Sequence, residues 1–479
     1  MLIGGQWLAD ADDVIVSVNP ATGQVNHEVC AASARHVDAA VAAASAAAGA
    51  TAWREMLPHK RARLLAQCAE VIEERSAEFA RIQMLENGKV LAECQSQALS
   101  AAATFRYYAA VCETLGSALT PARGPYLSLV VHEPYGVVAA ITPWNSPLTM
   151  EAQKVAPALA AGNAVILKPS EVTPSAALAL GQAALDAGIP PGILNVLPGT
   201  GAVAGDALVR HPGVKFVSFT GGTASGRRIA AIAAGKLMPV ALELGGKSPN
   251  IVFADADLDA AAAAVADGIF EGCGQSCVAG SRLFVERPVY ERVVDLVAAR
   301  ARCLEPDLPD APGARLGPLS SFAHRERVER LVASARAEGG AVVIGGARPQ
   351  QQQLAAGAYY LPTVIGGLSN AAGVCQQEIF GPVLCALVFD DEDDLVRQAN
   401  DSAYGLAAGI WSADYRRAWR VARRLEAGTV WINTYKQLSI ATPFGGFKDS
   451  GIGREKGVGG MRLYQQAKSL YFGLDLPGP

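Results

Sequence analysis

The chain has 479 residues, of which 51% are hydrophobic and 18% charged, and its formal net charge is −4. This composition favours two or more folded domains and argues against wholesale disorder. The slightly acidic balance gives no expectation of a nucleic-acid or anionic-membrane partner. No apolar run reaches the ~20 residues of a membrane helix, and the N-terminus lacks a signal-peptide pattern. Nine irregularly spaced cysteines indicate reduced thiols in a cytoplasmic protein.

The first half of the chain predicts a strand–helix alternation after a helical region. A short strand is expected at Val14 to Val18, and an alanine-rich helical pattern covers about 31–119. Two β-branched runs follow, at 128–131 and 136–141, on either side of a turn. Strands are then expected at 164–167, 195–197, 215–219 and 239–243, with helices at 174–187, 203–210 and 225–234. Such alternation predicts parallel βαβ units in a doubly wound sheet.

A second alternating region extends over about 250–433. Its expected helices are 258–270, 289–303, 392–399 and 415–425, and its expected strands are 282–286, 342–344, 383–389 and 428–433. A glycine-rich loop at 442–453 and a last strand near 468–472 follow. The pattern predicts a second α/β domain and a short C-terminal element.

One cysteine lies in a stretch suited to chemistry, Glu271 to Arg282 (EGCGQSCVAGSR). Glycines on both sides of Cys277 allow the backbone to approach a ligand closely. The thiol is either a nucleophile or a small buried hydrophobic group, and this stretch alone does not decide between them. Cys273 lies four residues earlier, but no second Cys or His pair completes a metal site.

Two polar stretches follow expected strands. Asn145 stands between two prolines, where its amide can stabilise an oxyanion or simply form an Asx turn. Lys168 and Glu171 come directly after a strand, where ligands of open α/β sheets bind. These two residues either contact ribose hydroxyls or form a solvated surface pair.

Two further stretches are rich in small residues. FTGGTASG at 219–226 joins a strand to a helix, which suits a pyrophosphate at a helix N-terminus, although it is not a GxGxxG fingerprint. The stretch Gly199 to Gly201 is equally weak evidence for a dinucleotide site when taken by itself. Glu243 ends an apolar strand in LELGGKSP, where burial raises a carboxyl pKa and suits it to general-base catalysis. The alternative is a salt bridge at the rim with Lys247.

Together, these stretches resemble one family in order and spacing. The motifs are TPWN at 142–145, KPSE at 168–171, FTGGTASG at 219–226, LELGGKSP at 242–249, GQSCVAGSR at 274–282, EIFGPV at 378–383 and PFGGFKDSGIGRE at 443–455. The chain resembles the NAD(P)-dependent aldehyde dehydrogenase superfamily, of the hydrolytic, non-acylating type, over essentially its whole length.

The resemblance implies an α/β fold of aldehyde dehydrogenase type, with two doubly wound α/β domains and a small β oligomerisation element. Residues 1–123 and 139–244 would form the dinucleotide-binding domain and 245–440 the catalytic domain. The oligomerisation element would be 124–138 with 460–479, combining a hairpin around Pro125 to Val138 with the C-terminal strand. Homodimers or homotetramers are expected.

The resemblance also assigns catalytic roles. Cys277 matches the nucleophile that forms a thiohemiacetal and then a thioester, and Asn145 with the Cys277 backbone N–H matches the oxyanion hole. Glu243 matches the base that activates water for thioester hydrolysis. Lys154 and Glu455 match positions linked to proton relay in some members.

The implied cofactor is NAD⁺, with NADP⁺ as a second option. Glu171 would repel a 2′-phosphate, whereas Lys168 could tolerate one. Many members carry Ser at the position of Gly222. The matching cofactor residues are Ile141, Thr142, Trp144, Lys168, Ser170, Glu171, Gly201, Phe219, Thr220, Gly221, Gly222, Thr223, Gly226, Leu244, Glu378 and Phe380.

The substrate is expected to be a small-molecule aldehyde in a tunnel wider or more polar than that of enzymes for small aliphatic aldehydes. Ser146 and Gln153 stand near positions that are frequently aromatic. The expected lining residues are Met150, Gln153, Ser276, Val278, Leu438 and Phe444. Two alternatives are a CoA-acylating enzyme, disfavoured by Glu243, and a non-catalytic binding protein, disfavoured by the joint presence of the three catalytic groups.

Overall fold

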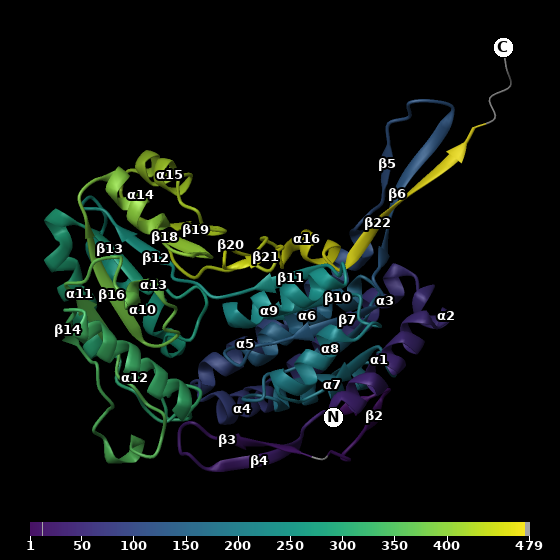
Figure 1. The fold of residues 1–479 in the computed structure, drawn as a ribbon, viewed down its shortest axis with the longest axis horizontal. Helices are drawn as coiled ribbons and strands as arrows, with labels where there is room; N and C mark the ends of the chain where they lie inside the picture. Colours follow the sequence, from purple (N-terminus) through teal and green to yellow (C-terminus); the bar gives the residue numbers. More distant parts are fainter. Residues whose placement is uncertain (12, 475–479) are drawn as a thin grey trace.

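The computed structural model describes residues 1–11 and 13–474, which form two lobes and a projecting arm (Figure 1). The first lobe surrounds an eight-stranded sheet. Its strands, in order across the sheet, are β2 (Gln6–Trp7), β1 (Leu2–Ile3), β9 (Leu194–Val196), β8 (Ala164–Lys168), β7 (Val137–Ile141), β10 (Phe216–Thr220), β11 (Val240–Glu243) and β21 (Gly451–Ile452). The strands from β9 to β11 are parallel, as the sequence predicts.

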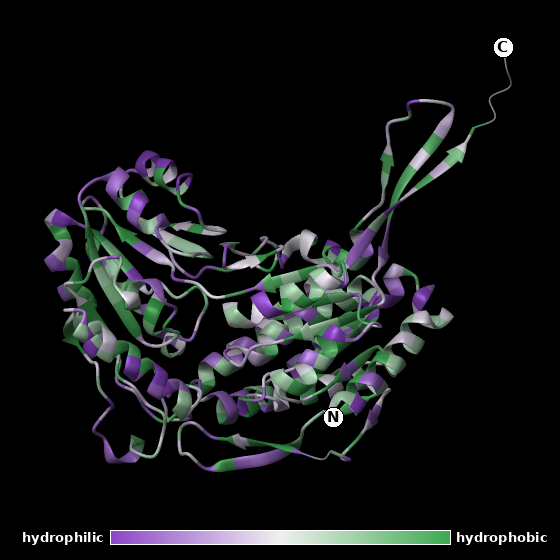
Figure 2. Ribbon diagram, in the orientation of Figure 1, coloured by the Kyte–Doolittle hydropathy of each residue, from purple (hydrophilic) through white to green (hydrophobic). Residues whose placement is uncertain are grey.

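Helices cover this first sheet and bury its apolar strands. They include α1 (Ala34–Gly49), α3 (Pro58–Glu74), α4 (Ser76–Asn87), α5 (Leu91–Thr114), α6 (Pro147–Ala160), α7 (Ser175–Asp186), α8 (Asp206–Arg210) and α9 (Thr223–Gly235). The residues of β7 and β8 are buried throughout, which is typical of parallel strands covered on both faces. Figure 2 shows these inner strands in green and polar residues on the outer helices.

The second lobe surrounds a seven-stranded sheet. Its order is β14 (Ala341–Ile344), β15 (Thr363–Gly366), β16 (Val383–Phe389), β13 (Arg282–Glu286), β12 (Pro249–Val252), β18 (Ala407–Trp411) and β19 (Thr429–Ile432). Side chains of β13 alternate between two cores: Leu283 and Val285 pack with α10 (Leu258–Phe270) and α11 (Tyr290–Arg302), whereas Phe284 packs with α12 (Phe322–Ala337). The predicted second doubly wound α/β unit is therefore present.

The last part of the chain connects the two lobes. After the second sheet is complete, β20 (Phe447–Lys448) pairs with β17 (Tyr404–Gly405), and β21 pairs antiparallel with β11. Glu243 and Gly451 are partners in that pairing. The short helix α16 (Gly457–Arg462) follows, in yellow beside the first lobe in Figure 1. The C-terminal segment thus completes the edge of a sheet formed by the first half of the chain.

The arm is a three-stranded antiparallel sheet in the order β22 (Gln465–Gly473), β6 (Tyr126–Pro134) and β5 (Ala118–Thr120). The expectation of a hairpin around Pro125 to Val138 is wrong, because β6 pairs with β5 and β22, and β7 lies inside the first sheet. Gly136, at φ +110°, lies between the two strands and lets the chain change sheets. The predicted pairing with the C-terminal strand is correct.

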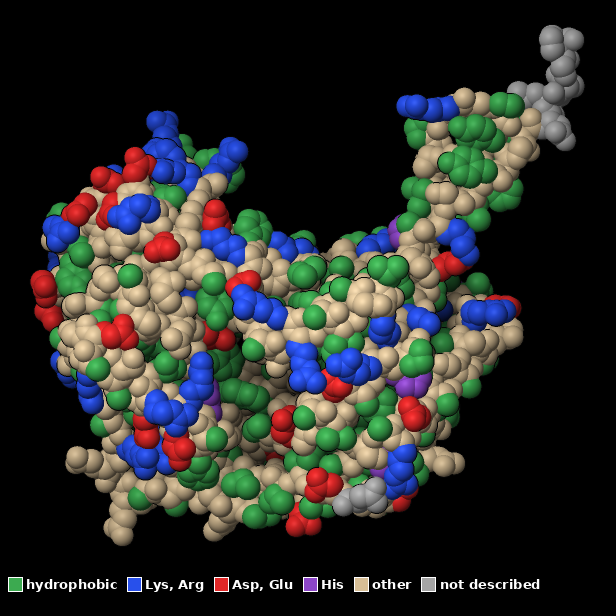
Figure 3. Space-filling view, in the orientation of Figure 1, with side chains coloured by type: hydrophobic (Ala, Val, Ile, Leu, Met, Phe, Trp, Pro, Cys, Tyr) green, Lys and Arg blue, Asp and Glu red, His purple; other side chains and the backbone are tan. Residues whose placement is uncertain are grey.

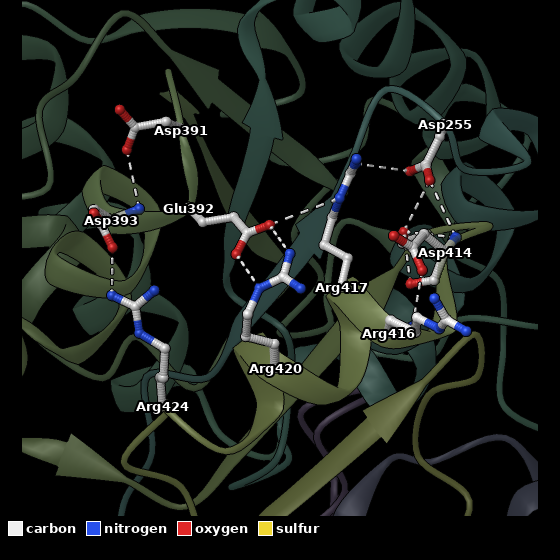
Figure 4. A network of polar contacts seen from close by, with 10 residues as sticks. Asp255, Asp391, Glu392, Asp393, Asp414, Arg416, Arg417, Arg420 and Arg424 are labelled. Atoms are coloured by element: carbon white, nitrogen blue, oxygen red, sulfur yellow. Dashed lines mark hydrogen bonds and ion pairs between the residues drawn. The ribbon is translucent and has the colours of Figure 1, made fainter.

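A polar network joins two outer helices of the second lobe, α14 (Glu392–Asn400) and α15 (Tyr415–Ala422) (Figure 4). Glu392 accepts hydrogen bonds from Arg420 at 2.9 and 2.5 Å, and Asp255 accepts one from Arg417 at 3.3 Å. Partly exposed pairs of this kind contribute little to stability individually. Within the described residues, no helix is both long and apolar enough to cross a bilayer.

Candidate active site

A cavity of about 710 Å³ lies where residues of the two lobes meet. The first lobe contributes the ends of β10 and β11, the turn after β7 and the start of α6, and the second lobe contributes the Cys277 loop and the residues before β16. Figure 3 shows the surface hollowed between the lobes. The cavity also receives residues of the C-terminal segment, Phe444 to Lys456. Residues distant in the sequence therefore form one concave site.

The Cys277 thiol is half-buried at this cavity, on the loop between α10 and β13. Gly246 allows the loop to pass close by, because a Cβ there would lie 2.3 Å from the Cys277 carbonyl oxygen. Burial raises the pKa of the Cys277 thiol to about 12, with further raising by the carboxyls of Glu378 and Glu243. The Lys456 ammonium opposes this rise.

Cys273 has a different environment. It is 2% exposed and packs with Ile251 and Phe253 in the core of the second lobe. Burial raises the pKa of its thiol. Its side chain does not line the cavity, so the structure distinguishes the two cysteines as the motifs do.

The carboxyl of Glu243 lies at the carboxyl end of β11, buried, with Oε2 lacking a hydrogen-bond partner among the described residues. Burial raises its pKa well above the usual value, and the nearby Glu455 raises it further. No salt bridge joins Glu243 to Lys247 within the described chain; Lys247 is buried near Cys385 and Cys375 instead. A buried carboxyl with a raised pKa beside this cavity has the properties of a general base that functions near neutral pH.

The Asn145 side chain is fixed between β7 and α6. Its Nδ2 donates to the backbone carbonyl of Gln275 at 2.8 Å, two residues before Cys277. An amide nitrogen carries two protons, so one remains for another acceptor. This bond holds the amide beside the thiol loop rather than in an isolated Asx turn.

Lys154 and Glu455 form a buried ion pair with an Nζ–Oε1 distance of 2.6 Å. Ser218 completes the group, because Lys154 Nζ donates to its Oγ at 3.0 Å and Oγ donates to Glu455 at 3.1 Å. Glu455 lines the cavity and acts on the pKa of Glu243. The predicted relay residues are thus adjacent to the candidate base.

One part of the cavity has the features of a dinucleotide site. Glu378 Oε1 accepts a hydrogen bond from the Gly246 backbone N–H at 2.9 Å, and burial raises the pKa of Glu378. Trp144, Phe380 and His324 form a group of aromatic contacts there. Of the predicted cofactor residues, those that line the cavity are Trp144, Thr220, Gly221, Gly222, Leu244, Glu378 and Phe380.

The remaining predicted cofactor residues lie outside the cavity lining: Ile141, Thr142, Lys168, Ser170, Glu171, Gly201, Phe219, Thr223 and Gly226. Gly226 serves helix packing, because a Cβ there would lie 2.4 Å from Leu244. Gly222 faces open space, because a Cβ added there would meet nothing within 4 Å. The hydroxyls of Thr142, Thr220 and Thr223 are buried without a partner among the described residues. Such unsatisfied groups indicate a ligand-binding surface.

Lys168 is buried at the end of β8, whereas Glu171 is half-exposed, and their charged atoms lie 3.9 Å apart. Lys168 Nζ donates to the Pro169 carbonyl at 2.6 Å. Burial lowers the pKa of Lys168 to about 8. The pair is therefore not the fully solvated one that the sequence left open.

The other part of the cavity contains all six predicted substrate residues, Met150, Gln153, Ser276, Val278, Leu438 and Phe444. Sequence reasoning missed further lining residues: Glu93, Ser96, Gln97, Glu271, His324, Arg327, Lys436, Ile440 and Lys456. None of these lies in one of the seven family motifs, although Glu271 begins the cysteine stretch and Lys456 directly follows the last motif. Glu93, Gln97, Glu271, Lys436 and Lys456 add polar side chains to the cavity lining, while the selectivity of the cavity stays a prediction.

Comparison with known proteins identifies the family. The family model described as aldehyde dehydrogenase matches residues 7–470. The chain belongs to the aldehyde dehydrogenase family.

Solved structures agree with this membership. A Burkholderia cenocepacia protein assigned to the aldehyde dehydrogenases is 40% identical, over 100% of this chain and 98% of its own, with a TM-score of 0.97. Indole-3-acetaldehyde dehydrogenase of P. syringae, solved with NAD⁺, is 38% identical over 99% and 96%, with a TM-score of 0.96. Betaine aldehyde dehydrogenase of Staphylococcus aureus, also solved with NAD⁺, is 34% identical over 99% and 96%, with a TM-score of 0.97. This aldehyde dehydrogenase is an oxidoreductase that acts on aldehydes.

Proposed function

We propose that this aldehyde dehydrogenase oxidises an aldehyde to the carboxylic acid with NAD⁺, using Cys277 as nucleophile and Glu243 as the base for hydrolysis. The observation that carries the proposal is the meeting of the two groups in one cavity, with Asn145 fixed against the thiol loop. A nucleophile, a base and an oxyanion donor in one concave site are the parts of an acyl-transfer centre.

The first half of the reaction belongs to Cys277. Its thiolate attacks the aldehyde carbon, and the carbonyl oxygen becomes the oxyanion of a thiohemiacetal. The free Nδ2 proton of Asn145 and the backbone N–H of Cys277 stabilise that oxyanion. NAD⁺, when bound, supplies the hydride acceptor. Loss of the hydride leaves a thioester on Cys277.

The second half belongs to Glu243. Its carboxylate takes a proton from a water molecule that attacks the thioester, which releases the acid and restores the thiolate. Burial and the neighbouring Glu455 raise the pKa of Glu243, which strengthens it as a base. Lys154 and Glu455 lie next to it and provide a path for the proton away from the site.

The dinucleotide fits the residues present. Unpaired hydroxyls of Thr142, Thr220 and Thr223 provide hydrogen-bonding groups, and the space at Gly222 admits a pyrophosphate near the N-terminus of α9. Glu378 would accept from the nicotinamide ribose, and Lys168 would bind the adenosine ribose.

We expect NAD⁺ to be preferred to NADP⁺. Glu171 lies 3.9 Å from Lys168, so a negative charge accompanies the lysine where a 2′-phosphate would bind. Comparing KM for the two dinucleotides tests this preference, and a lower KM for NADP⁺ would reverse the assignment.

We also propose the domain organisation, the oligomerisation and the cellular location of this enzyme from its family membership and its fold. We assign 1–123 and 139–244 to the dinucleotide-binding domain, 245–440 to the catalytic domain, and 124–138 with 460–479 to the oligomerisation element, whose strands β6 and β22 pair in the arm. The nine cysteines are free in the structure, which supports a reducing, cytoplasmic location.

The decisive experiment replaces Cys277 by Ser and follows NADH formation. The expected loss of kcat/KM is on the order of 10³-fold or more, because a hydroxyl is a far weaker nucleophile at neutral pH. Cys273→Ala is the matched control and should keep its turnover, since that thiol lies in the core. Near-normal activity of Cys277→Ser would refute the mechanism. Product analysis with added CoA checks the second half, because acyl-CoA formation would exclude hydrolysis as the main route.

A further inference from the structure

Lys456 brings a cation into the aldehyde part of the cavity. The residue follows Glu455 in the C-terminal segment, is 8% exposed and lines the cavity with Cys277 and Glu243. Its Nζ lies 5.1 Å from the centroid of the Phe444 ring. Phe444 in turn packs beside Cys277 against the Val278 cluster. The ammonium is thus close to the place where an aldehyde must bind.

The backbone holds Lys456 in an unusual conformation. Its φ of 60° and ψ of 175° fall in a region that is essentially restricted to glycine. The flanking structure fixes it, because Phe444 and Glu455 exchange two backbone hydrogen bonds of 2.8 Å and the Lys456 carbonyl accepts from Gly460 at 2.9 Å. A lysine retained in such a conformation, with its ammonium at the cavity, indicates a role for the side chain.

The other cations at the cavity already have partners. Lys436 lies 3.7 Å from Glu271, and Arg327 donates to the backbone carbonyls of Glu378 and Ile379 at 2.6 and 2.7 Å. Lys154, behind the cavity, is paired with Glu455. Among the described residues, no carboxylate forms an ion pair with Lys456.

The two carboxyls that act on Lys456, Glu455 and Glu243, form no ion pair with it among the described residues. Glu455 is held by Lys154 and Ser218, and burial raises the pKa of Glu243. Burial also lowers the pKa of Lys456, because it penalises the charged ammonium, although the nearby Glu455, Cys277 and Glu243 act in the opposite direction. A substrate that carries a negative charge would remove that cost.

We propose that Lys456 binds the carboxylate of the substrate, so that this enzyme prefers short aldehydes with a terminal carboxylate group. The inference rests on the proposed attack of Cys277 on the aldehyde carbon. The carboxylate pairs with Nζ over the Phe444 ring, and the aldehyde carbon lies at the thiol. Phe444 and Val278 cover the methylene groups between the two ends. Lys456 is therefore a specificity-determining residue.

A different role for the same cation would be to stabilise the Cys277 thiolate, and alkylation in the absence of cofactor separates the two. Iodoacetate and iodoacetamide react at the same sulfur but differ in charge. Their rates at Cys277 are measured by peptide mass spectrometry for the wild type, Lys456→Gln and Lys436→Gln. We expect the iodoacetate/iodoacetamide rate ratio to fall about tenfold in Lys456→Gln, as for loss of a charged hydrogen bond. The ratio should hold in Lys436→Gln, whose cation already has a partner.

Steady-state kinetics give the second readout, with 4-oxobutanoate and its uncharged methyl ester as a matched pair. The wild type should favour the acid, and the preference in kcat/KM should fall about tenfold in Lys456→Gln and be largely kept in Lys456→Arg. Lys456→Gly removes the cation and relieves the backbone, so it provides a variant without added strain and should lose the same preference.

Three outcomes would overturn the proposal. An equal slowing of both alkylating agents in Lys456→Gln would assign the lysine to the thiolate instead. Unchanged ratios in Lys456→Gln and Lys456→Gly would leave it without a role in selection. A wild type that oxidises the methyl ester better than the acid would contradict this inference alone, because aldehyde oxidation would still be present, whereas near-normal activity of Cys277→Ser would contradict the proposed function.

Discussion

Three residues at the cavity are held in backbone conformations that ordinary side chains avoid. Phe380, Lys436 and Lys456 have φ values of 60°, 57° and 60°, and all three line the cavity. Such conformations cost about 1–3 kcal/mol each and persist where the surroundings fix them. The strained residues lie where side chains would contact a ligand. This is consistent with a site that lowers the stability of the fold in favour of function.

The protonation of Cys277 predicts how activity varies with pH. Burial raises its pKa to about 12, so the thiolate is a minor species near neutral pH, and its fraction rises about tenfold per pH unit. Glu243 changes in the same direction, because its raised pKa leaves more base available as the pH increases. We therefore expect kcat/KM to rise steadily from pH 6 to pH 9 in initial-rate measurements.

The control for this profile is chemical rather than kinetic. Iodoacetamide labelling of Cys277 should show the same rise, whereas the Glu243→Gln variant should keep the labelling profile while losing steady-state turnover. A flat or acid-shifted kcat/KM profile would contradict the raised thiol pKa.

At the scale of elements, helix α6 carries a buried acid with no apparent chemical role. Glu151 is 0% exposed, and both its carboxyl oxygens lack a partner within the described chain. Burial raises its pKa well above the usual value, and the charge of Glu86 on α4 raises it further. The folded protein therefore favours the protonated form of this side chain.

This acid predicts a pH dependence of stability. The folded-state pKa lies above the unfolded value, so its contribution is fully present below the unfolded pKa and is lost as the pH rises toward the folded one. The loss is at most about 1.4 kcal/mol per pH unit for one group. Glu151→Gln stays neutral, so its thermal midpoint should fall less than that of the wild type between pH 5 and pH 8. Exposed Glu28→Gln is the control, and a parallel fall in all three proteins would rule out Glu151 as the cause.

Much of the fold was predictable at this scale because its parallel strands are short apolar runs between helices. β8, β10, β11, β13 and β16 were expected within a residue or two. The strand that pairs with β6 was not predicted correctly. A turn such as 133–136 joins the two strands of one hairpin in most sequences, and only the tertiary structure assigns β7 to another sheet.

Helices α6 and α12 were also missed. α6 begins at Pro147, directly after a motif whose turn residues hide the helix start, and contains Pro157. α12 has mixed apolar and charged residues with weak periodicity. The site was predicted better than its surroundings: the thiol, base and amide lie in family motifs, whereas Lys456 and Lys436 reach the cavity through loop conformations that no sequence pattern specifies.

At the scale of the whole molecule, the arm exposes large hydrophobic side chains when the chain is considered alone. Tyr471 and Phe472 of β22 are 67% and 51% exposed, and Figure 3 shows hydrophobic side chains over the arm at the upper right. β22 is also an edge strand with unpaired backbone groups on one side. Exposed apolar edges of this kind favour pairing with another chain.

Charged residues on this strand should prevent the proposed homo-oligomerisation. We expect Tyr471→Glu combined with Phe472→Glu to reduce the molar mass measured by light scattering to that of one chain, because buried carboxylates would oppose the contact. The control for added charge is Tyr415→Glu combined with Trp419→Glu, because both side chains are exposed on α15. If the doubly charged arm variant keeps the mass of the wild type, the arm is not the interface.

The pairing of β21 with β11 has a consequence for how the enzyme is made. Glu243 leaves the ribosome early, but Gly451, its partner across the sheet, follows only after about 200 further residues. At roughly 5–20 residues per second, translation of that interval takes on the order of 10–40 s. During that time the nascent chain has Cys277 without Phe444, Glu455 or Lys456 around it. The centre is therefore completed only after 444–456 has been synthesised, and a chain truncated before Gly451 would carry Cys277 and Lys154 without Glu455 and Lys456.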